Sequence, residues 1–419
     1  MRIGRNNGFF KPLRLLLSVT TLSNPCLNKN RPYFLAVAGL LGLLVFGNAS
    51  QAAPYLPSSA NEVLERLPTL ANGSDQELRK LRLSLNNDPQ NLALAIRTTN
   101  TLIEKARADA DPRYYGYAEA AVRYWWKQPQ PPSAVLMLRA TIRQHRHDFD
   151  GALADVHEVL AEEPRNAQAW LTQAVIQGVK GDYGLALNSC MVLKRLSSRL
   201  IAATCAANAA SLSGKAKPAY QLLKDTLPGT TEVQEQLWAL TALAEIAARL
   251  GDSGAAETHY LQALAFKQRD VYLLSAYTDF LLDQNRPDQV VALLKDDTRA
   301  DGLLLRLALA EQMLGSANSA QHIEELKARM AAYRLRGDNI HQREEARINL
   351  ALLKQPKEAL RLALLNWEVQ REPWDARLVL EAALAADDFN AAKPVIAWLA
   401  RSKMEDKVLQ QLMEKLEQR

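Results

Sequence analysis

Small residues recur along the chain with a period of roughly 34 residues, and this spacing limits the possible folds more than any other feature. Ala140 and Ala152 lie twelve residues apart in one period, and Ala174 and Ala186 repeat that spacing in the next. Two small side chains let a pair of antiparallel helices approach closely, while larger apolar residues fill the space between neighbouring units. The pattern therefore predicts an array of helical hairpins.

The same frame continues toward the C-terminus with one weak region. In two units a glycine typical of turns, Gly181 or Gly251, lies between the two small residues that face each other. The same spacing of small residues appears again late in the chain, at Ala359 and Ala392. Between these regular parts, the helix expected from Ser319 to Arg336 is longer than a regular unit allows. We expect this region to be a degenerate helical pair.

Length and composition agree with a helical array. A chain of 419 residues is too long for one ordinary core, but each unit of an array packs only on its neighbours. Hydrophobic residues make up 48% of the sequence and aromatic residues only 6%, and Ala and Leu dominate the apolar set. This composition is typical of helices that pack closely on helices.

The units resemble the tetratricopeptide repeat (TPR), a pair of antiparallel helices joined by a tight turn. The clearest unit begins at Ala167 and has Trp170 at its fourth position, Ala174 at its eighth and Ala186 at its twentieth. Residues 111–121, DPRYYGYAEAA, resemble a stretch of exported bacterial repeat proteins. The resemblance implies an all-α, right-handed α-solenoid of TPR-like helical hairpins that binds proteins or peptides.

These observations together predict the organisation of the whole chain. The expected segments are a signal peptide at 1–52, an atypical N-terminal helical region with a Pro-rich break at 53–132, a regular TPR array at 133–300, a degenerate helical pair at 301–339, C-terminal TPR-like repeats at 340–401 and a capping helix at 402–419.

The first 52 residues have the three parts of a secretory signal. Basic residues precede an uncharged apolar run from Tyr33 to Gly47, and Ser50-Gln51-Ala52 follows as a small-residue exit. We expect cleavage after Ala52 and a periplasmic mature protein. The alternative is an uncleaved leader that anchors the protein in the inner membrane, facing the periplasm.

The positive charge of the chain belongs largely to this leader. The leader contains six Lys or Arg residues and no acid, and the remainder has 45 Lys and Arg against 46 Asp and Glu. A nucleic-acid-binding protein is expected to keep its basic surface in the folded part. We therefore expect no nucleic-acid partner.

The sequence nominates no catalytic residue and no cofactor. It contains no GxSxG, HExxH or CxxC motif and no phosphate-binding glycine loop. His145 and His147 have the spacing of two metal ligands, but we favour cations at the end of a helix and expect no metal site. An enzyme with its site in the atypical regions 92–132 or 301–337 is the competing function.

Cys190 and Cys205 fall in consecutive helices of adjacent units. A disulfide requires a narrow range of Cα separations that most pairs of helix positions miss. We therefore favour two small buried hydrophobic residues, with a disulfide as the alternative.

In TPR proteins the first helix of each unit lines the concave face, so the resemblance nominates a binding surface. The concave positions predicted to contact a partner are Asn208, Trp238, Glu245, Arg249, Tyr272, Asp279 and Asp283. Trp238 and Tyr272 hold equivalent places in adjacent units, and the acids favour a partner segment with basic residues. Thr204 stands where carboxylate-clamping members have Lys, so that ligand is not expected.

The predicted function is therefore an extracytoplasmic scaffold for protein–protein or protein–peptide interaction, as an accessory of envelope assembly or export. Besides the enzyme, the remaining alternative is a membrane-anchored TPR adaptor. Contact with a membrane is expected only with an uncleaved leader, and the sequence predicts neither the oligomeric state nor the identity of the partner.

Overall fold

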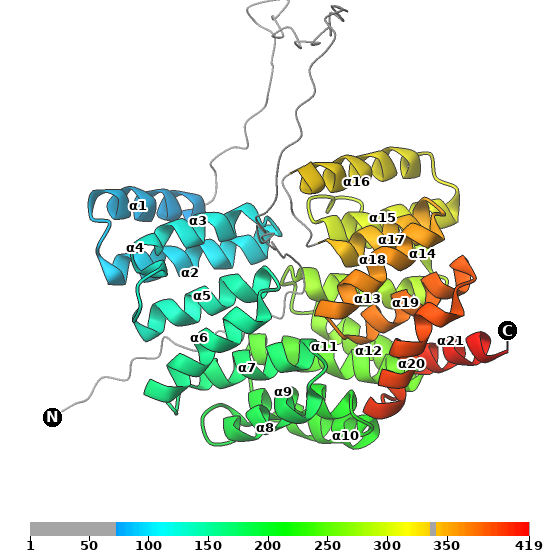
Figure 1. The fold of residues 1–419 in the computed structure, drawn as a ribbon, viewed down its shortest axis with the longest axis horizontal. Helices are drawn as coiled ribbons and strands as arrows, with labels where there is room; N and C mark the ends of the chain where they lie inside the picture. The colour runs from blue at the N-terminus through cyan, green and yellow to red at the C-terminus, as the bar shows by residue number, and fades with distance from the viewer. Residues whose placement is uncertain (1–72, 336–340, 419) are drawn as a thin grey trace, which may run out of the picture.

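The computed structural model describes residues 73–335 and 341–418, and this part of the chain is an all-α, right-handed α-solenoid (Figure 1). The predicted signal peptide, its cleavage after Ala52 and the alternative anchor lie outside the described residues. Each helix among the described residues is too short or too polar to cross a membrane.

The N-terminal region and the regular array contain fourteen of the described α-helices, which pack as consecutive hairpins. They are α1 (Gly73–Asn87), α2 (Leu92–Asp109), α3 (Arg113–Ala121), α4 (Arg123–Trp126), α5 (Ser133–His145), α6 (Phe149–Glu162), α7 (Ala167–Val179), α8 (Tyr183–Leu193), α9 (Arg199–Ser211), α10 (Ala216–Thr226), α11 (Val233–Leu250), α12 (Ser253–Leu264), α13 (Val271–Asp283) and α14 (Pro287–Leu294).

The rest of the described chain, from α15 onward, continues the solenoid. Its helices are α15 (Asp301–Leu314), α16 (Asn318–Leu335), α17 (Gln342–Arg347), a π-helical turn at Ile348–Leu352, α18 (Pro356–Val369), α19 (Pro373–Ala386), α20 (Phe389–Ser402) and α21 (Lys407–Glu417). The long helix expected in the degenerate pair is α16, with 18 residues. The amphipathic α21 buries one side against the core of α19 and α20.

The small residues of the repeat frame lie where the hairpins are tightest. Ala140 of α5 and Ala152 of α6 are fully buried in one apolar cluster, and Ala244 of α11 and Ala256 of α12 are fully buried in another. The prediction that these positions form the contacts between paired helices is confirmed. Close packing there leaves no room for a larger side chain.

Local signals in the sequence set the ends of these helices. The Asp148 carboxylate caps α6 by accepting a hydrogen bond from the Gly151 N–H at 3.0 Å, and the Asp252 carboxylate caps α12 in the same way. At Gly181 and Gly251 the backbone has φ of +83° and +77°, which favours glycine. The turns between paired helices therefore form at the glycines that recur in the repeat frame.

The two cysteines correct our expectation. Cys190 of α8 and Cys205 of α9 form a disulfide, with their Cα atoms 5.5 Å apart. The expectation of two separate buried thiols is therefore wrong for this pair. The close packing of α8 on α9 brings this pair within the Cα separation that a disulfide requires.

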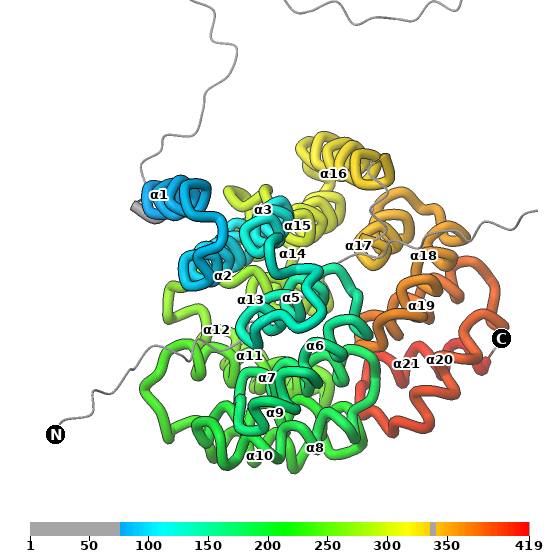
Figure 2. Tube along the Cα trace, turned by 60° about the vertical axis from the view of Figure 1, so that its left-hand side comes forward, coloured from blue at the N-terminus to red at the C-terminus, as the bar shows by residue number. Residues whose placement is uncertain are grey.

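The solenoid curls until its C-terminal helices lie beside the middle of the array (Figure 2). The Arg371 N–H donates to the Val179 carbonyl oxygen at 2.8 Å, and the Tyr183 hydroxyl donates to the Arg371 carbonyl oxygen at 2.8 Å. Farther along, the Ala216 N–H donates to the Glu405 carboxylate at 2.6 Å. These contacts join residues almost two hundred positions apart, so the array closes on itself.

Candidate functional site

A cavity of 1940 Å³ lies inside the closed solenoid. Its walls come mainly from the first helices of successive hairpins, because those helices face inward along the curve (Figure 1). One residue from each of these helices illustrates the arrangement: Val175 of α7, Asn208 of α9, Trp238 of α11, Tyr272 of α13, Arg306 of α15, Arg343 of α17 and Trp374 of α19.

All seven residues that the sequence nominated line this one cavity. They are Asn208, Trp238, Glu245, Arg249, Tyr272, Asp279 and Asp283. The repeat frame predicted their common surface because equivalent positions of successive units point the same way. Their role in holding a partner stays a prediction.

The cavity has an apolar side on α7 to α9. Val175, Val179 and Leu212 line this side, together with the Cys190–Cys205 disulfide. Trp238 is partly buried and packs on the same apolar cluster. A hydrophobic ligand group is therefore best accommodated against these helices.

The opposite side is charged, but its acids already have partners within the chain. Asp279 is buried, and its carboxylate pairs with Arg306 and, at 2.7 Å, with Arg347. Burial alone would raise the pKa of Asp279, but the two guanidinium groups outweigh burial and lower it. Asp279 is therefore ionised and neutralised inside the wall.

The other nominated acids are also engaged. Asp283 accepts two hydrogen bonds from Arg377, each 2.7 Å long, and Glu245 accepts one from the Tyr272 hydroxyl at 2.7 Å. Burial raises the pKa of Glu245, while Arg249 and the Tyr272 hydrogen bond oppose that rise. The acids at these positions thus give no free negative surface, and the sequence-based preference for a basic partner loses its basis.

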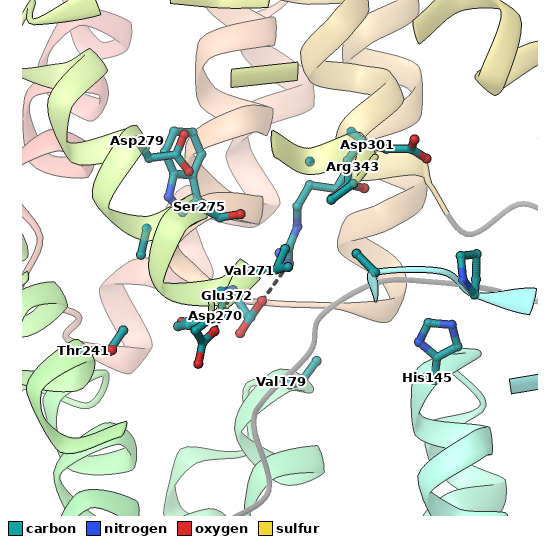
Figure 3. Close-up of a pocket in the computed structure, with 18 of the residues that line it drawn as sticks. His145, Val179, Thr241, Asp270, Val271, Ser275, Asp279, Asp301, Arg343 and Glu372 are labelled. Atoms are coloured by element: carbon teal, nitrogen blue, oxygen red, sulfur yellow. Dashed lines mark hydrogen bonds and ion pairs between the residues drawn. The ribbon is translucent and has the colours of Figure 1, made fainter. Parts of the chain in front are cut away.

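Figure 3 shows Arg343 reaching from α17 toward Glu372, which begins α19. The two side chains lie 2.7 Å apart, and Arg343 also binds the buried Asp375 carboxylate at 2.6 Å. Burial raises the pKa of Glu372 to about 7, although Arg343 lowers it, and the neighbouring Asp375 adds to the rise. Burial and Asp375 thus disfavour the charged form of Glu372 inside the cavity wall, whereas Arg343 favours it.

Sequence analysis missed the arginines of this wall and one tryptophan beside them. The guanidinium groups of Arg347 and Arg377 each lie over the Trp374 ring, 4.4 and 4.3 Å from its centroid. Arg343 and Arg347 are four residues apart, so both point to one face of α17. That spacing is visible in the sequence, but the predicted site positions come only from the regular units, and α17 lies outside them.

The described residues contain no group of three or more His, Cys, Asp or Glu side chains placed to bind a metal ion. His145 lies at the cavity with its ring stacked on Tyr115 at 3.6 Å between centroids, and His147 stacks on Phe149. The two histidines thus face different aromatic rings.

Comparisons with known proteins give similarity in fold alone. No protein-family profile and no curated protein matches the sequence. Solved structures that are similar include a chain of the APC/C hetero-tetramer Cut9-Hcn1, with 14% identity over 74% of this chain and a TM-score of 0.40. This protein spans only 52% of that chain.

Two further structures are a tetratricopeptide repeat protein from Parabacteroides merdae ATCC 43184 and the TPR domain of P58(IPK). The first is 14% identical over 74% of this chain and 99% of its own, with a TM-score of 0.36. The second is 14% identical over 83% and 94%, with a TM-score of 0.22. Such distant similarity carries no conclusion about function, and the fold class follows from the helices described above.

Proposed function

We propose that this protein is a non-enzymatic, extracytoplasmic scaffold that binds a segment of a partner protein in its central cavity. The observation that carries the proposal is the meeting of seven concave positions from α9, α11 and α13 in one cavity of 1940 Å³. An α-solenoid presents such a surface as an extended binding face. The described residues contain no group of three or more His, Cys, Asp or Glu side chains that suggests metal chemistry instead.

The two sides of the cavity define the segment that fits best. Apolar side chains of α7 and α9 line one side of the cavity. Arginines of α15, α17 and α19, with the acids that they pair with, line the other. A helical or extended segment with one apolar and one polar face matches both sides at once. Trp238 and Tyr272 are the expected anchors, because large aromatic residues dominate most binding interfaces.

The disulfide supports an extracytoplasmic location. Cys190 and Cys205 are placed for a bond that persists in oxidising compartments and is rare in the cytosol. The leader has the pattern of an export signal, so both features agree with a periplasmic protein. We further propose a role in envelope assembly or export.

Capture from an envelope extract, followed by mass spectrometry, tests the binding function. The parent protein is expected to enrich a specific partner, and Trp238→Ala to lose more than about 2 kcal/mol of affinity for it. Tyr124→Ala is the matched control, because Tyr124 is 49% exposed and does not line the cavity. Equal capture by parent, Trp238→Ala and Tyr272→Ala would overturn the proposed cavity site.

Sequencing the N-terminus of the purified protein tests the compartment. A mature chain that begins at Ala53 is expected for a periplasmic protein. A full-length chain recovered only from the inner membrane would support the anchored adaptor instead.

A further inference from the structure

The C-terminal unit, defined here as α18 to α21 (Pro356–Glu417), has a hydrophobic core of its own. Leu380, Val395 and Leu409 are among its buried residues. From the array between α5 and α14, only Tyr183 joins this core as a buried member, and Leu212 packs against it. The unit therefore does not depend on the array for most of its apolar burial.

Val369 of α18 packs on the apolar core of α5 to α7, and the Trp398 ring contacts the ring of Tyr183. The other contacts that close the unit onto the array are polar. They are the two hydrogen bonds of Arg371 with Val179 and Tyr183, the bond between Ala216 and Glu405, and the paired hydrogen bonds between Arg377 and Asp283. Interfaces of this kind resemble transient contacts between domains more than the interior of one domain.

Three glycines in turns of the array lie in direct contact with the C-terminal unit. A Cβ atom added to Gly181 would lie 2.9 Å from Trp398, and one added to Gly214 would lie 3.1 Å from the Cβ of Lys403. At Gly251 the added atom would lie 2.3 Å from the Lys407 side chain. The backbone of three successive hairpins is thus bare where the C-terminal unit rests on it.

We propose that the C-terminal unit is a lid, closed in this structure, which swings away from the turns after α7, α9 and α11 to open the cavity. A separate core lets the unit move as one body, because only a few apolar side chains pack across the interface and its polar contacts exchange with water at small net cost. The unit stays joined to the array where α17 packs on α18.

The lid forms part of the cavity wall, so its movement changes the binding site. Trp374 and Arg377 of α19 and Val408 of α21 line the cavity. Swinging the unit away would remove these side chains and break the bond to Asp283. The movement of the lid does not depend on the proposed function. The further claim, that an open lid admits a partner segment, does rest on the proposed function.

Pulsed dipolar spectroscopy on a doubly spin-labelled chain tests the movement. The labels are placed at Leu222→Cys on α10 and Arg401→Cys on α20, both at exposed positions, in a chain that also carries Cys26→Ser. The native cysteines are bonded to each other and do not react. The parent is expected to give one dominant distance.

The triple variant Tyr183→Phe, Asp283→Ala, Glu405→Ala removes the side chains that hold the lid. Each lost hydrogen bond shifts an opening equilibrium by about fivefold, so a second, longer distance is expected to appear. The matched control is Tyr124→Phe, Asp225→Ala, Glu358→Ala, whose side chains lie away from this interface. A triple variant that stays folded and keeps the parent distance would overturn the lid.

A second measurement connects the lid to the cavity. Ser275→Cys places a thiol on the cavity wall (Figure 3), where it reacts with a maleimide that carries a polyethylene glycol chain. Three shifts of about fivefold multiply, so the triple variant is expected to react about a hundredfold faster than the parent or the control triple. A longer distance between the labels without faster labelling of Ser275→Cys would mean that the unit moves without opening the cavity. That result would overturn the role of the lid in controlling access to the cavity. Partner binding itself is tested separately, by the capture experiment.

Discussion

Two kinds of interface, or seam, hold this solenoid together, and they are built differently. One kind joins consecutive hairpins of the regular array, and the other closes the C-terminal unit onto that array. Consecutive hairpins share apolar cores: one cluster joins α5, α6 and α7, and another joins α9, α10 and α11. The C-terminal unit meets the same array through hydrogen bonds, an ion pair and bare glycine turns, and only a few apolar side chains, among them Tyr183 and Val369, pack across. Helical hairpins of the same type thus form either a permanent contact or a releasable one. The difference depends on whether apolar or mainly polar groups fill the interface between them.

The largest predicted effect is on the buried ion pair of the first regular hairpin. Arg139 donates to both oxygens of Asp155 and to the Trp126 carbonyl oxygen, and Asp155 is only 2% exposed. Arg139→Ala is expected to lower the free energy of unfolding by about 3 kcal/mol, because it leaves a buried carboxylate with fewer partners. Arg143 still reaches Asp155 at 2.8 Å, which limits the loss.

Urea denaturation of the purified variant measures this loss. Arg361→Ala is the control, since Arg361 forms an exposed pair with Glu358, and such pairs contribute about 0–1 kcal/mol. If both variants lose the same small amount, the buried pair does not stabilise the array as described.

The next effect concerns the small-residue contacts inside a hairpin. Ala244 and Ala256 are fully buried in one cluster, so Ala256→Leu is expected to overpack it at a cost of about 1–3 kcal/mol. Thermal unfolding measures the loss, and Ala161→Leu on the exposed side of α6 is the control. An unchanged melting temperature for Ala256→Leu would mean that this seam is looser than the structure indicates.

A pH-dependent effect is expected where α5 ends at the cavity. Burial, and then the neighbouring His341, Arg146 and Arg107, lower the pKa of His145 to about 3, from an ordinary value near 6.5. Between these two pKa values the imidazole binds a proton in the unfolded chain but not in the folded one. The free energy of unfolding therefore falls as the pH falls below 6.5. The expected loss from pH 7 to pH 5 is roughly 1–2 kcal/mol.

Unfolding curves at several pH values test this expectation. His145→Gln is expected to flatten the dependence in that range, and His157→Gln, at an exposed position of α6, is expected to leave it unchanged. A parent-like slope in His145→Gln would assign the dependence to other groups.

The smallest effect separates the two seams directly. Gly181 and Gly315 both have positive φ, so replacing either by Ala costs about 1 kcal/mol of backbone strain. An added Cβ meets Trp398 of the lid only at Gly181, whereas nothing lies within 4 Å at Gly315. Hydrogen exchange in α20 is expected to speed up in Gly181→Ala alone. Equal exchange in both variants would mean that the glycine turns do not seat the lid.

Sequence reasoning predicted the parts of this molecule that repeat. The spacing of Ala140, Ala152 and their equivalents predicted the hairpins, and the same frame placed Trp238 and Tyr272 on one cavity. Each of these predictions uses residues within one or two periods of each other, where neighbouring helices must pack in the same way.

The remaining features depend on contacts that have no local signature. No spacing in the sequence relates Val179 to Arg371, so the closure of the array was not foreseen. The pairing of Asp279 with Arg306 and Arg347 was missed for the same reason, because its partners come from later helices. Charge patterns read along one face therefore overestimated the acidity of the cavity.

The closing contact also orders the assembly of the chain. Hairpins from α5 to α14 bury their cores against neighbours in the sequence, so each forms soon after its own residues are available. The bond between Val179 and Arg371 has to wait for the helices that follow α14. A growing chain therefore passes through an open crescent, with its future cavity exposed to solvent, before the last helices turn it into a ring.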